Sequence, residues 1–190
     1  MSNPYVQAIV RKNLEPNDFV RTDPRATRAI LSCIDVGLKV WDPCCGDGAL
    51  AKVLSEGKRE VIATDLINYG FGKGGVNFFT VKHRLAPAIV MNPPFKLSKE
   101  FVQHAFDLGC SPVVVFGRLA FLEGCDRKTW FEKTKLSDVY ILSRRPRMWY
   151  GNEKAPFTGM IAFAWFVWKA GHQGPWRGHF LDIKEYGESW

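Results

Sequence analysis

The segment that decides the fold is LKVWDPCCGDGALAKVL, residues 38–54. Its first four residues form a mostly apolar run typical of a buried strand, and a helical pattern begins near Gly48. Between the two, Gly46 and Gly48 allow a tight turn and a close approach to a ligand, because neither has a Cβ. A helix N-terminus at this point also offers free N–H groups. The segment predicts a strand, a ligand-binding glycine loop and a helix, with an ordinary Asp-Gly turn as the alternative.

Similar apolar runs follow along the chain, and helical patterns separate several of them. This alternation predicts an α/β fold with a mostly parallel sheet and helices on both faces. In such sheets a ligand binds beyond the carboxyl ends of the strands, where the polar residues that follow each run collect. The expected strands are 38–41, 61–64, 88–91, 113–116, 139–142 and 161–168, and the expected helices are 24–36, 48–57, 98–109 and 126–135.

The second expected strand is followed by Asp65. Its offset from Asp42 is close to the one at which an acidic residue meets a pair of ribose hydroxyls. Beyond Asp65, the glycine-rich segment 66–75 and the short interval 81–87 leave little room for crossover helices. With the intervening residues 76–80 counted as the third strand, we therefore expect reduced helices between the second, third and fourth strands.

Length and composition indicate one globular domain over residues 1–190, with 171–190 as a C-terminal tail. No apolar run reaches the roughly 18–20 residues that span a membrane, and residues 1–10 lack the pattern of a secretory signal. A cytoplasmic location is therefore expected. The five cysteines contain no C-x-x-C pair, which favours reduced thiols over disulfides or a zinc site. The four histidines show no metal-ligand spacing, and no metal is expected.

A net charge of +7, from 26 Lys and Arg against 19 Asp and Glu, favours a polyanionic partner. Aromatic residues make up 14% of the chain, and exposed ones could stack on unpaired bases. Charge by itself does not identify the partner as nucleic acid, because many basic proteins bind none.

A second motif, Asn92-Pro93-Pro94-Phe95, follows the expected strand 88–91. The two prolines fix their own φ angles and hold the residue before each of them in an extended conformation. The motif predicts a stiff turn in which carbonyl groups and the Asn92 side chain point outward, followed by an exposed aromatic ring. A turn without a function is the alternative.

The two motifs together resemble the signatures of class I S-adenosylmethionine-dependent methyltransferases, specifically the amino-methyltransferases that act on adenine N6. Those enzymes carry a D-P-x-x-G-x-G cofactor loop, matched here by residues 42–48, and a catalytic [DNS]-P-P-[YFW] tetrapeptide, matched by 92–95. Residues 19–24 are similar to the aromatic-x-T-P segment that touches the methionine moiety, with Asp23 inserted before Pro24. Later segments, at 118–124, 143–147 and 155–168, resemble those of small phage-type or prophage-type DNA adenine methyltransferases.

The resemblance implies a Rossmann-like fold and S-adenosyl-L-methionine as cofactor. Asp42 and the glycine backbone would hold the methionine end, and Asp65 would accept hydrogen bonds from the ribose hydroxyls. Leu66 or Ile67 would cover the adenine ring, and Asn77 occupies the position of an acidic residue that often binds the adenine amino group. The implied cofactor residues are Thr22, Asp42, Cys44, Gly46, Asp47, Gly48, Asp65, Leu66, Asn77, Phe78 and Asn92.

The resemblance also implies Asn92, Pro93, Pro94 and Phe95 as the catalytic residues. An exocyclic aromatic amine is a poor nucleophile because its lone pair is delocalised into the ring. The Asn92 side-chain oxygen and the Pro93 carbonyl would accept its two hydrogens, which aims the lone pair at the methyl donor. Phe95 would stack on the base.

DNA is the implied partner, and the basic residues Lys96, Arg118, Arg144, Arg145 and Arg147 are the expected phosphate contacts. For the last three, a solvated charged turn is the alternative. The interval 49–91 is too short for an inserted target-recognition domain. We therefore expect loops such as 144–157 to read a short or loosely defined site.

Three other functions stay open. Similar tetrapeptides serve the amino groups of RNA adenine or guanine and the side-chain amide of protein glutamine, because each is a planar NH2 that needs two acceptors. Net charge disfavours a protein substrate but does not separate DNA from RNA. The third alternative is a catalytically silent fold that binds nucleic acid or a partner protein, and the intact tetrapeptide argues against it.

Overall fold

The computed structural model describes residues 20–146, 149–150, 153–154 and 161–187. Its centre is a seven-stranded sheet with the strand order β10-β6-β9-β5-β4-β2-β3. Neighbouring strands are parallel, except that β9 runs antiparallel to both β5 and β6. The strands are β2 (Lys39–Asp42), β3 (Glu60–Ala63), β4 (Ala88–Met91), β5 (Val113–Arg118), β6 (Asp138–Leu142), β9 (Phe163–Trp168) and β10 (Arg177–Leu181).

Helices in the described residues connect most of these strands. The α-helices are α2 (Pro24–Cys33), α3 (Ala49–Ser55), α4 (Ser98–Asp107) and α5 (Cys125–Thr134), and the 3-10 helices are η1 (Phe78–Thr80), η2 (Phe95–Leu97) and η3 (Leu119–Leu122). Within this part of the chain, none of the helices combines the length and the apolar character that crossing a membrane requires.

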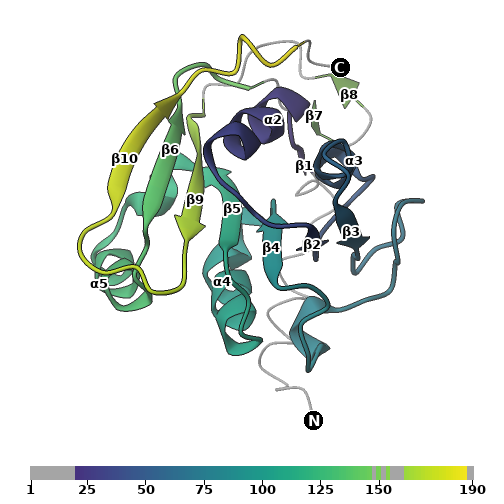
Figure 1. The fold of residues 1–190 in the computed structure, drawn as a ribbon, viewed down its shortest axis with the longest axis horizontal. Helices are drawn as coiled ribbons and strands as arrows, with labels where there is room; N and C mark the ends of the chain where they lie inside the picture. Colours follow the sequence, from purple (N-terminus) through teal and green to yellow (C-terminus); the bar gives the residue numbers. More distant parts are fainter. Residues whose placement is uncertain (1–19, 147–148, 151–152, 155–160, 188–190) are drawn as a thin grey trace.

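The sheet separates two hydrophobic cores, because successive residues of a strand point to opposite faces. In β4, Ala88 and Val90 pack into the core under α2 and α3, whereas Ile89 and Met91 pack into the core under α4 and α5. Figure 1 shows α2 and α3 on one side of the sheet and α4 and α5 on the other. The prediction of a mostly parallel sheet covered on both faces is confirmed, with element ends shifted by a few residues.

Two parts of the sheet differ from the expectation. Between β3 and β4 the expected strand at 76–80 is wrong: Phe78–Thr80 form η1, and the β pairing in this described connection is one parallel bridge, Thr64 with Lys73. Gly70, Gly72 and Gly75 have positive φ angles, which interrupt an extended strand. At the other edge, β10 lies inside the expected tail 171–190 and pairs in parallel with β6.

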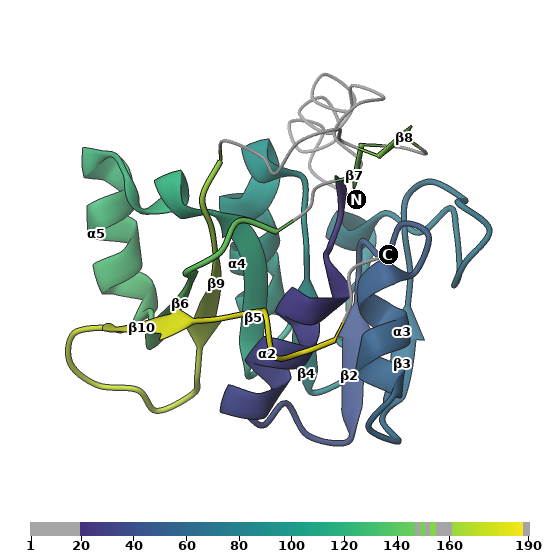
Figure 2. The same cartoon turned by 90° about the horizontal axis from the view of Figure 1, so that it is seen from above.

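A second, small sheet joins three two-residue strands in the order β1-β7-β8. They are β1 (Val20–Arg21), β7 (Trp149–Tyr150) and β8 (Glu153–Lys154), and both pairings are antiparallel. Figure 2 shows β7 and β8 beyond one end of the strands of the large sheet. The segment after β6 therefore returns to the start of the described chain, just before α2.

Asp23, the residue inserted before Pro24, starts α2. Its Oδ1 accepts a hydrogen bond from Arg25 N–H at 3.0 Å, and its Oδ2 lies 2.6 Å from Arg25 Nη2. Pro24 follows at the first helical turn, where its missing N–H costs nothing. An Asp before a Pro at the start of a helical pattern is an N-cap signal, and it accounts for the insertion.

The Asp138 carboxylate, at the first residue of β6, is 1% exposed and contacts three basic side chains. Lys169 Nζ lies 3.2 Å from Oδ2, and Arg177 Nη2 and His179 Nε2 each lie 3.0 Å from Oδ1. Burial raises the pKa of Asp138, but the hydrogen bonds from His179 and Lys169 outweigh burial, so this pKa lies below its ordinary value. The cluster joins β6 to β10 and to the end of β9.

Candidate active site

A cavity of about 420 Å³ lies beyond the carboxyl ends of β2, β3 and β4. This is the location that a parallel sheet predicts for a ligand. Of the predicted site residues, Thr22, Asp42, Cys44, Asp47, Asp65, Leu66, Asn77, Phe78, Asn92 and Pro94 line the cavity, whereas Gly46, Gly48, Pro93 and Phe95 do not. The cavity is also lined by Val20 and Arg21, from the segment 19–24 that resembles the methionine-contacting one, and by Tyr69 and Phe101, which the motifs did not indicate.

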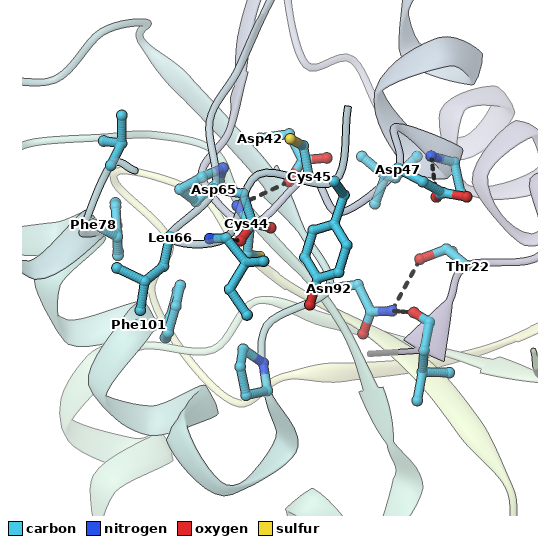
Figure 3. Close-up of a pocket in the computed structure, with 18 of the residues that line it drawn as sticks. Thr22, Asp42, Cys44, Cys45, Asp47, Asp65, Leu66, Phe78, Asn92 and Phe101 are labelled. Carbon is cyan, nitrogen blue, oxygen red and sulfur yellow. Dashed lines mark hydrogen bonds between the residues drawn. The ribbon is translucent and has the colours of Figure 1, made fainter. Parts of the chain in front are cut away.

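The cavity has an apolar end and a polar end. Figure 3 shows Leu66, Phe78 and Phe101 together at one end, and Asn92 and Thr22 at the other. The Phe78 and Phe101 rings stack with their centroids 5.1 Å apart. This arrangement suits an elongated ligand with a flat apolar group at one end and polar groups toward the other.

The glycine loop is held in place by Asp65. Gly46 N–H donates to Asp65 Oδ2 at 2.8 Å, and Ile67 N–H donates to Oδ1 at 2.9 Å. Gly48 has a φ of 86°, and a Cβ there would lie 2.5 Å from the Phe71 ring, so the turn requires glycine. Burial raises the pKa of Asp65 above its ordinary value, although three backbone hydrogen bonds act against it. A carboxylate has about four acceptor sites, so Asp65 can still accept a hydrogen bond from a ligand.

Asp42 is the buried acid of the cavity, with 1% of its surface exposed. Its Oδ1 accepts a hydrogen bond from Cys44 N–H at 3.3 Å, but its Oδ2 is buried and has no hydrogen-bond partner among the described residues. Burial, with a smaller contribution from the Asp65 charge, raises the pKa of Asp42 to about 8. The unliganded carboxyl therefore keeps its proton at neutral pH, and a cationic donor group placed at Oδ2 would favour its charged form.

Asn92, directly after β4, is fixed by β1 and the residue that follows it. Its Nδ2 donates to Val20 O at 2.9 Å and to Thr22 Oγ1 at 3.0 Å. The Val20 carbonyl can only accept, so the amide atom that faces it must be the nitrogen. Figure 3 shows both hydrogen bonds on the Thr22 side of the amide. The amide oxygen is therefore the acceptor that Asn92 offers to a ligand in the cavity.

The two cysteines of the glycine loop are unsuited to nucleophilic catalysis. Burial and the nearby Asp42 and Asp65 charges raise the pKa of Cys44 well above its ordinary value, and the same causes raise the pKa of Cys45 to about 12. Both thiols are protonated at neutral pH, whereas the reactive form is the thiolate. Across the described ranges, no three His, Cys, Asp or Glu side chains are grouped as metal ligands.

Two predicted cofactor residues already have protein partners. Asn77 Oδ1 accepts a hydrogen bond from Phe79 N–H at 3.0 Å and so caps η1. The Asp47 carboxylate forms an ion pair with the guanidinium of Arg21, the second residue of β1. Arg21 brings a positive charge to the cavity wall, and its position depends on β1, which the sequence motifs did not indicate.

Phe95, expected to be an exposed ring, is half-buried outside the cavity. Its ring centroid lies 5.8 Å from that of Phe163 in β9, and the Arg118 Cζ lies 4.6 Å from the Phe95 centroid. The expectation of an exposed ring fails because η2 begins at Phe95 and turns the ring toward the core beside β5 and β9.

The predicted phosphate contacts follow the carboxyl ends of several strands. Arg118 ends β5, Lys96 lies in η2 after β4, and Arg145 lies beyond β6; all three are exposed. Arg144 is held in an ion pair with Asp182, with Nε 2.9 Å from Oδ1. The fifth predicted contact, Arg147, lies outside the described residues.

No protein-family model and no curated protein matches the chain. Solved structures resemble it. A methyltransferase subunit of a type I restriction-modification system from Streptococcus thermophilus is 13% identical, with a TM-score of 0.56 over 84% of this chain and 45% of that one. A protein described as a modification subunit of a type I restriction enzyme from Vibrio vulnificus is 13% identical, with a TM-score of 0.59 over 98% and 52%. A protein described as an RNA methyltransferase from Pyrococcus horikoshii is 17% identical, with a TM-score of 0.61 over 89% and 98%.

These likenesses show the fold: the chain has the Rossmann-like fold of class I methyltransferases, as the resemblance of its motifs predicts. It spans about half the length of the two restriction-modification subunits. Because one fold serves many reactions, the activity has to be argued from the site.

Proposed function

We propose that this chain transfers a methyl group from S-adenosyl-L-methionine to the exocyclic N6 amino group of adenine in DNA. The observation that carries the proposal is the fixed amide of Asn92, whose nitrogen is bound by Val20 and Thr22 and whose oxygen remains for a ligand in the cavity. An oxygen held in this way can accept one hydrogen of a planar amino group. The net charge of +7 supports a nucleic acid as the acceptor, and the intact tetrapeptide 92–95 supports adenine.

The cavity fits S-adenosyl-L-methionine. The unpartnered Asp42 Oδ2 suits the ammonium of the methionine moiety, because that group supplies the missing donor. Asp65 would accept from the ribose hydroxyls, and the apolar end, with Leu66 and Phe78, would cover the adenine ring. When bound, this cofactor supplies an electrophilic methyl group on a sulfonium.

The residues of the chain would act on the acceptor amine. Asn92 Oδ1 would accept one hydrogen, and the carbonyl of Pro93, between the cavity-lining residues Asn92 and Pro94, would accept the other. These bonds would turn the nitrogen toward tetrahedral geometry and stabilise the developing positive charge. The lone pair so aimed would take the methyl group that bound S-adenosyl-L-methionine supplies, and the electrons of the S–CH3 bond would remain on sulfur. The surplus proton then passes from the product to water, so no general base is required beforehand. Preorganised groups of this kind contribute about 3–4 kcal/mol each.

The test compares wild type with Asn92→Ala on adenine-containing DNA, with N6-methyladenine measured by mass spectrometry. We expect kcat to fall by about 100- to 1000-fold, because one preorganised acceptor is lost. The Kd for S-adenosyl-L-methionine, measured by calorimetry, should stay within about twofold. Gln103→Ala is the matched control, since Gln103 is an amide that donates to Asp107 on the exposed face of α4. Full methylation by Asn92→Ala would contradict the proposed role of the amide oxygen.

RNA is the second candidate acceptor. The observation that favours it is the likeness to the Pyrococcus horikoshii protein described as an RNA methyltransferase, because this chain covers 98% of that one. Radiolabelled methyl transfer to DNA, tRNA, rRNA and a glutamine peptide in parallel assays separates the acceptors. Label in rRNA or tRNA but not in DNA would replace the proposed substrate. Folded protein that binds no S-adenosyl-L-methionine would indicate a fold without catalysis.

A further inference from the structure

Three side chains next to the cavity contact one another in a row, here called the Arg118 stack: Arg118, Phe95 and Phe163. The Arg118 Cζ lies 4.6 Å from the Phe95 ring centroid, and the Phe95 ring is tilted by 51° against that of Phe163, with the two centroids 5.8 Å apart. Phe163 is 1% exposed and stacks in turn on Phe116, with centroids 5.2 Å apart and an interplanar angle of 5°. The stack is therefore supported from the core, and its outermost member is a guanidinium.

The Arg118 stack follows the same end of the sheet as Asn92, the proposed hydrogen-bond acceptor. Strands β4 and β5 pair in parallel with Met91 opposite Val115, so Asn92 and Arg118 both follow the paired part of these neighbouring strands. Phe95 is in the same turn as Asn92. Arg118 is exposed, and none of the carboxylates in the described ranges forms an ion pair with it. Its guanidinium is thus available to a ligand next to the Asn92 oxygen.

We propose that the Arg118 guanidinium is the platform on which the acceptor base stacks, with Phe95 beneath it as support; this rests on the proposed function. A guanidinium is planar and weakly hydrated, and it stacks both on aromatic rings and on nucleobases. With Phe95 covered by Arg118, the base meets the guanidinium first. Phe95 contributes by supporting the guanidinium from the core side, and Asn92 then receives the amino group at the edge of the base.

Two other roles for Arg118 give different results. A phosphate contact depends on charge, so Arg118→Lys would retain activity. Arg118→Ala would reduce the slope of log K against log salt concentration by about one. If Arg118 only covers Phe95 and keeps the base from stacking on that ring, Arg118→Ala would raise the activity. A stacking platform requires the planar guanidinium, so Arg118→Lys and Arg118→Ala would both lower the activity.

The experiment compares wild type, Arg118→Lys and Arg118→Ala in radiolabelled methyl transfer to heat-denatured genomic DNA over a series of salt concentrations. We expect both variants to lose about 10- to 100-fold in kcat/KM for DNA, as loss of one base-stacking partner implies. Arg118→Lys should keep the wild-type salt slope, because its charge is unchanged. The Kd for S-adenosyl-L-methionine should stay within about twofold in all three proteins.

Lys133→Ala is the matched charge control, because Lys133 is an exposed residue in the last turn of α5 and removing it costs one positive charge outside the site. The proposal is overturned if Arg118→Lys retains wild-type activity, or if Arg118→Ala equals or exceeds it. If the wild-type protein itself methylates no DNA, the proposed function is wrong, and the Arg118 proposal is removed with it. This outcome differs from the two above, in which the wild type is active.

Discussion

Two aspartates of the sheet, Asp42 and Asp138, are buried to the same extent and have opposite chemistry. Each is 1% exposed. Asp138, at the start of β6, has three basic partners, and its pKa lies below its ordinary value. Asp42, at the end of β2, has one oxygen without a partner among the described residues, and its pKa is raised to about 8. Burial alone therefore does not mark a functional acid, whereas burial with an unmet hydrogen bond does.

The difference follows from which end of the sheet each residue occupies. The Asp138 partners come from β10 and from the residue after β9, so the fold itself satisfies the carboxylate. At the carboxyl ends of the strands the chain leaves a cavity, and the donor for Asp42 has to come from a ligand. The comparison predicts that Asp42 affects binding and that Asp138 affects stability.

The largest expected effect is on cofactor affinity. Asp42→Asn should weaken binding of S-adenosyl-L-methionine by about 10- to 100-fold, because a hydrogen bond to a charged group contributes about 1.5–3 kcal/mol. Asp138→Asn should leave this affinity unchanged. Isothermal calorimetry on the two variants measures both values, and equal losses in the two would remove the distinction between the aspartates.

The second effect is on folding. Asp138→Asn should lower the free energy of unfolding at pH 7 by about 1–2 kcal/mol, a modest value because Lys169 and Arg177 are 41% and 64% exposed and regain water. Since the pKa of Asp138 is lowered from 3.8, its stabilisation is complete above that pH and is lost as the pH falls through the folded value. Urea unfolding should therefore show a difference at pH 7 that shrinks as the pH falls below 3.8. A difference that persists in acid would mean that the charge of Asp138 is not its source.

The third effect is the pH dependence of the unliganded protein. The unfolded chain releases the Asp42 proton near its ordinary pKa of 3.8, while the folded chain keeps it up to about 8. Wild type should therefore lose stability relative to Asp42→Asn as the pH rises between these two values, by about 1.4 kcal/mol for each pH unit. Thermal unfolding of both proteins across this range measures the difference. Parallel curves would mean that the raised pKa of Asp42 is incorrect.

The elements that were predictable from the sequence are those set by local patterns. The run at residues 88–91 is bounded by Pro87 and the Asn92 turn, and β4 coincides with it. The glycine loop at 46–48 could be placed because no other residue type tolerates the turn at Gly48. Since β2 and β4 are parallel, Asp42 and Asn92 lie at the same end of the sheet. The location of the site could therefore be predicted once the strands were placed.

The remaining features depend on partners distant in sequence. The two-residue strands β1, β7 and β8 are too short for a period-two pattern, and β10 is an edge strand whose residues are mostly exposed. The contact of Asn92 with Val20 joins residues 72 positions apart, which no local motif encodes. Arg118 over Phe95 is of the same kind: each residue could be singled out alone, but their contact depends on the packing of η2 against β5 and β9.

The backbone of β1 makes two connections at once. Val20 pairs with Tyr150 of β7, and the Val20 carbonyl accepts the hydrogen bond that orients Asn92. Sliding this strand along its axis would move both attachments in the same direction. The orientation of the Asn92 amide and the position of β7 are therefore coupled through β1. A substitution that shifts β7 is expected to change the orientation of Asn92 as well.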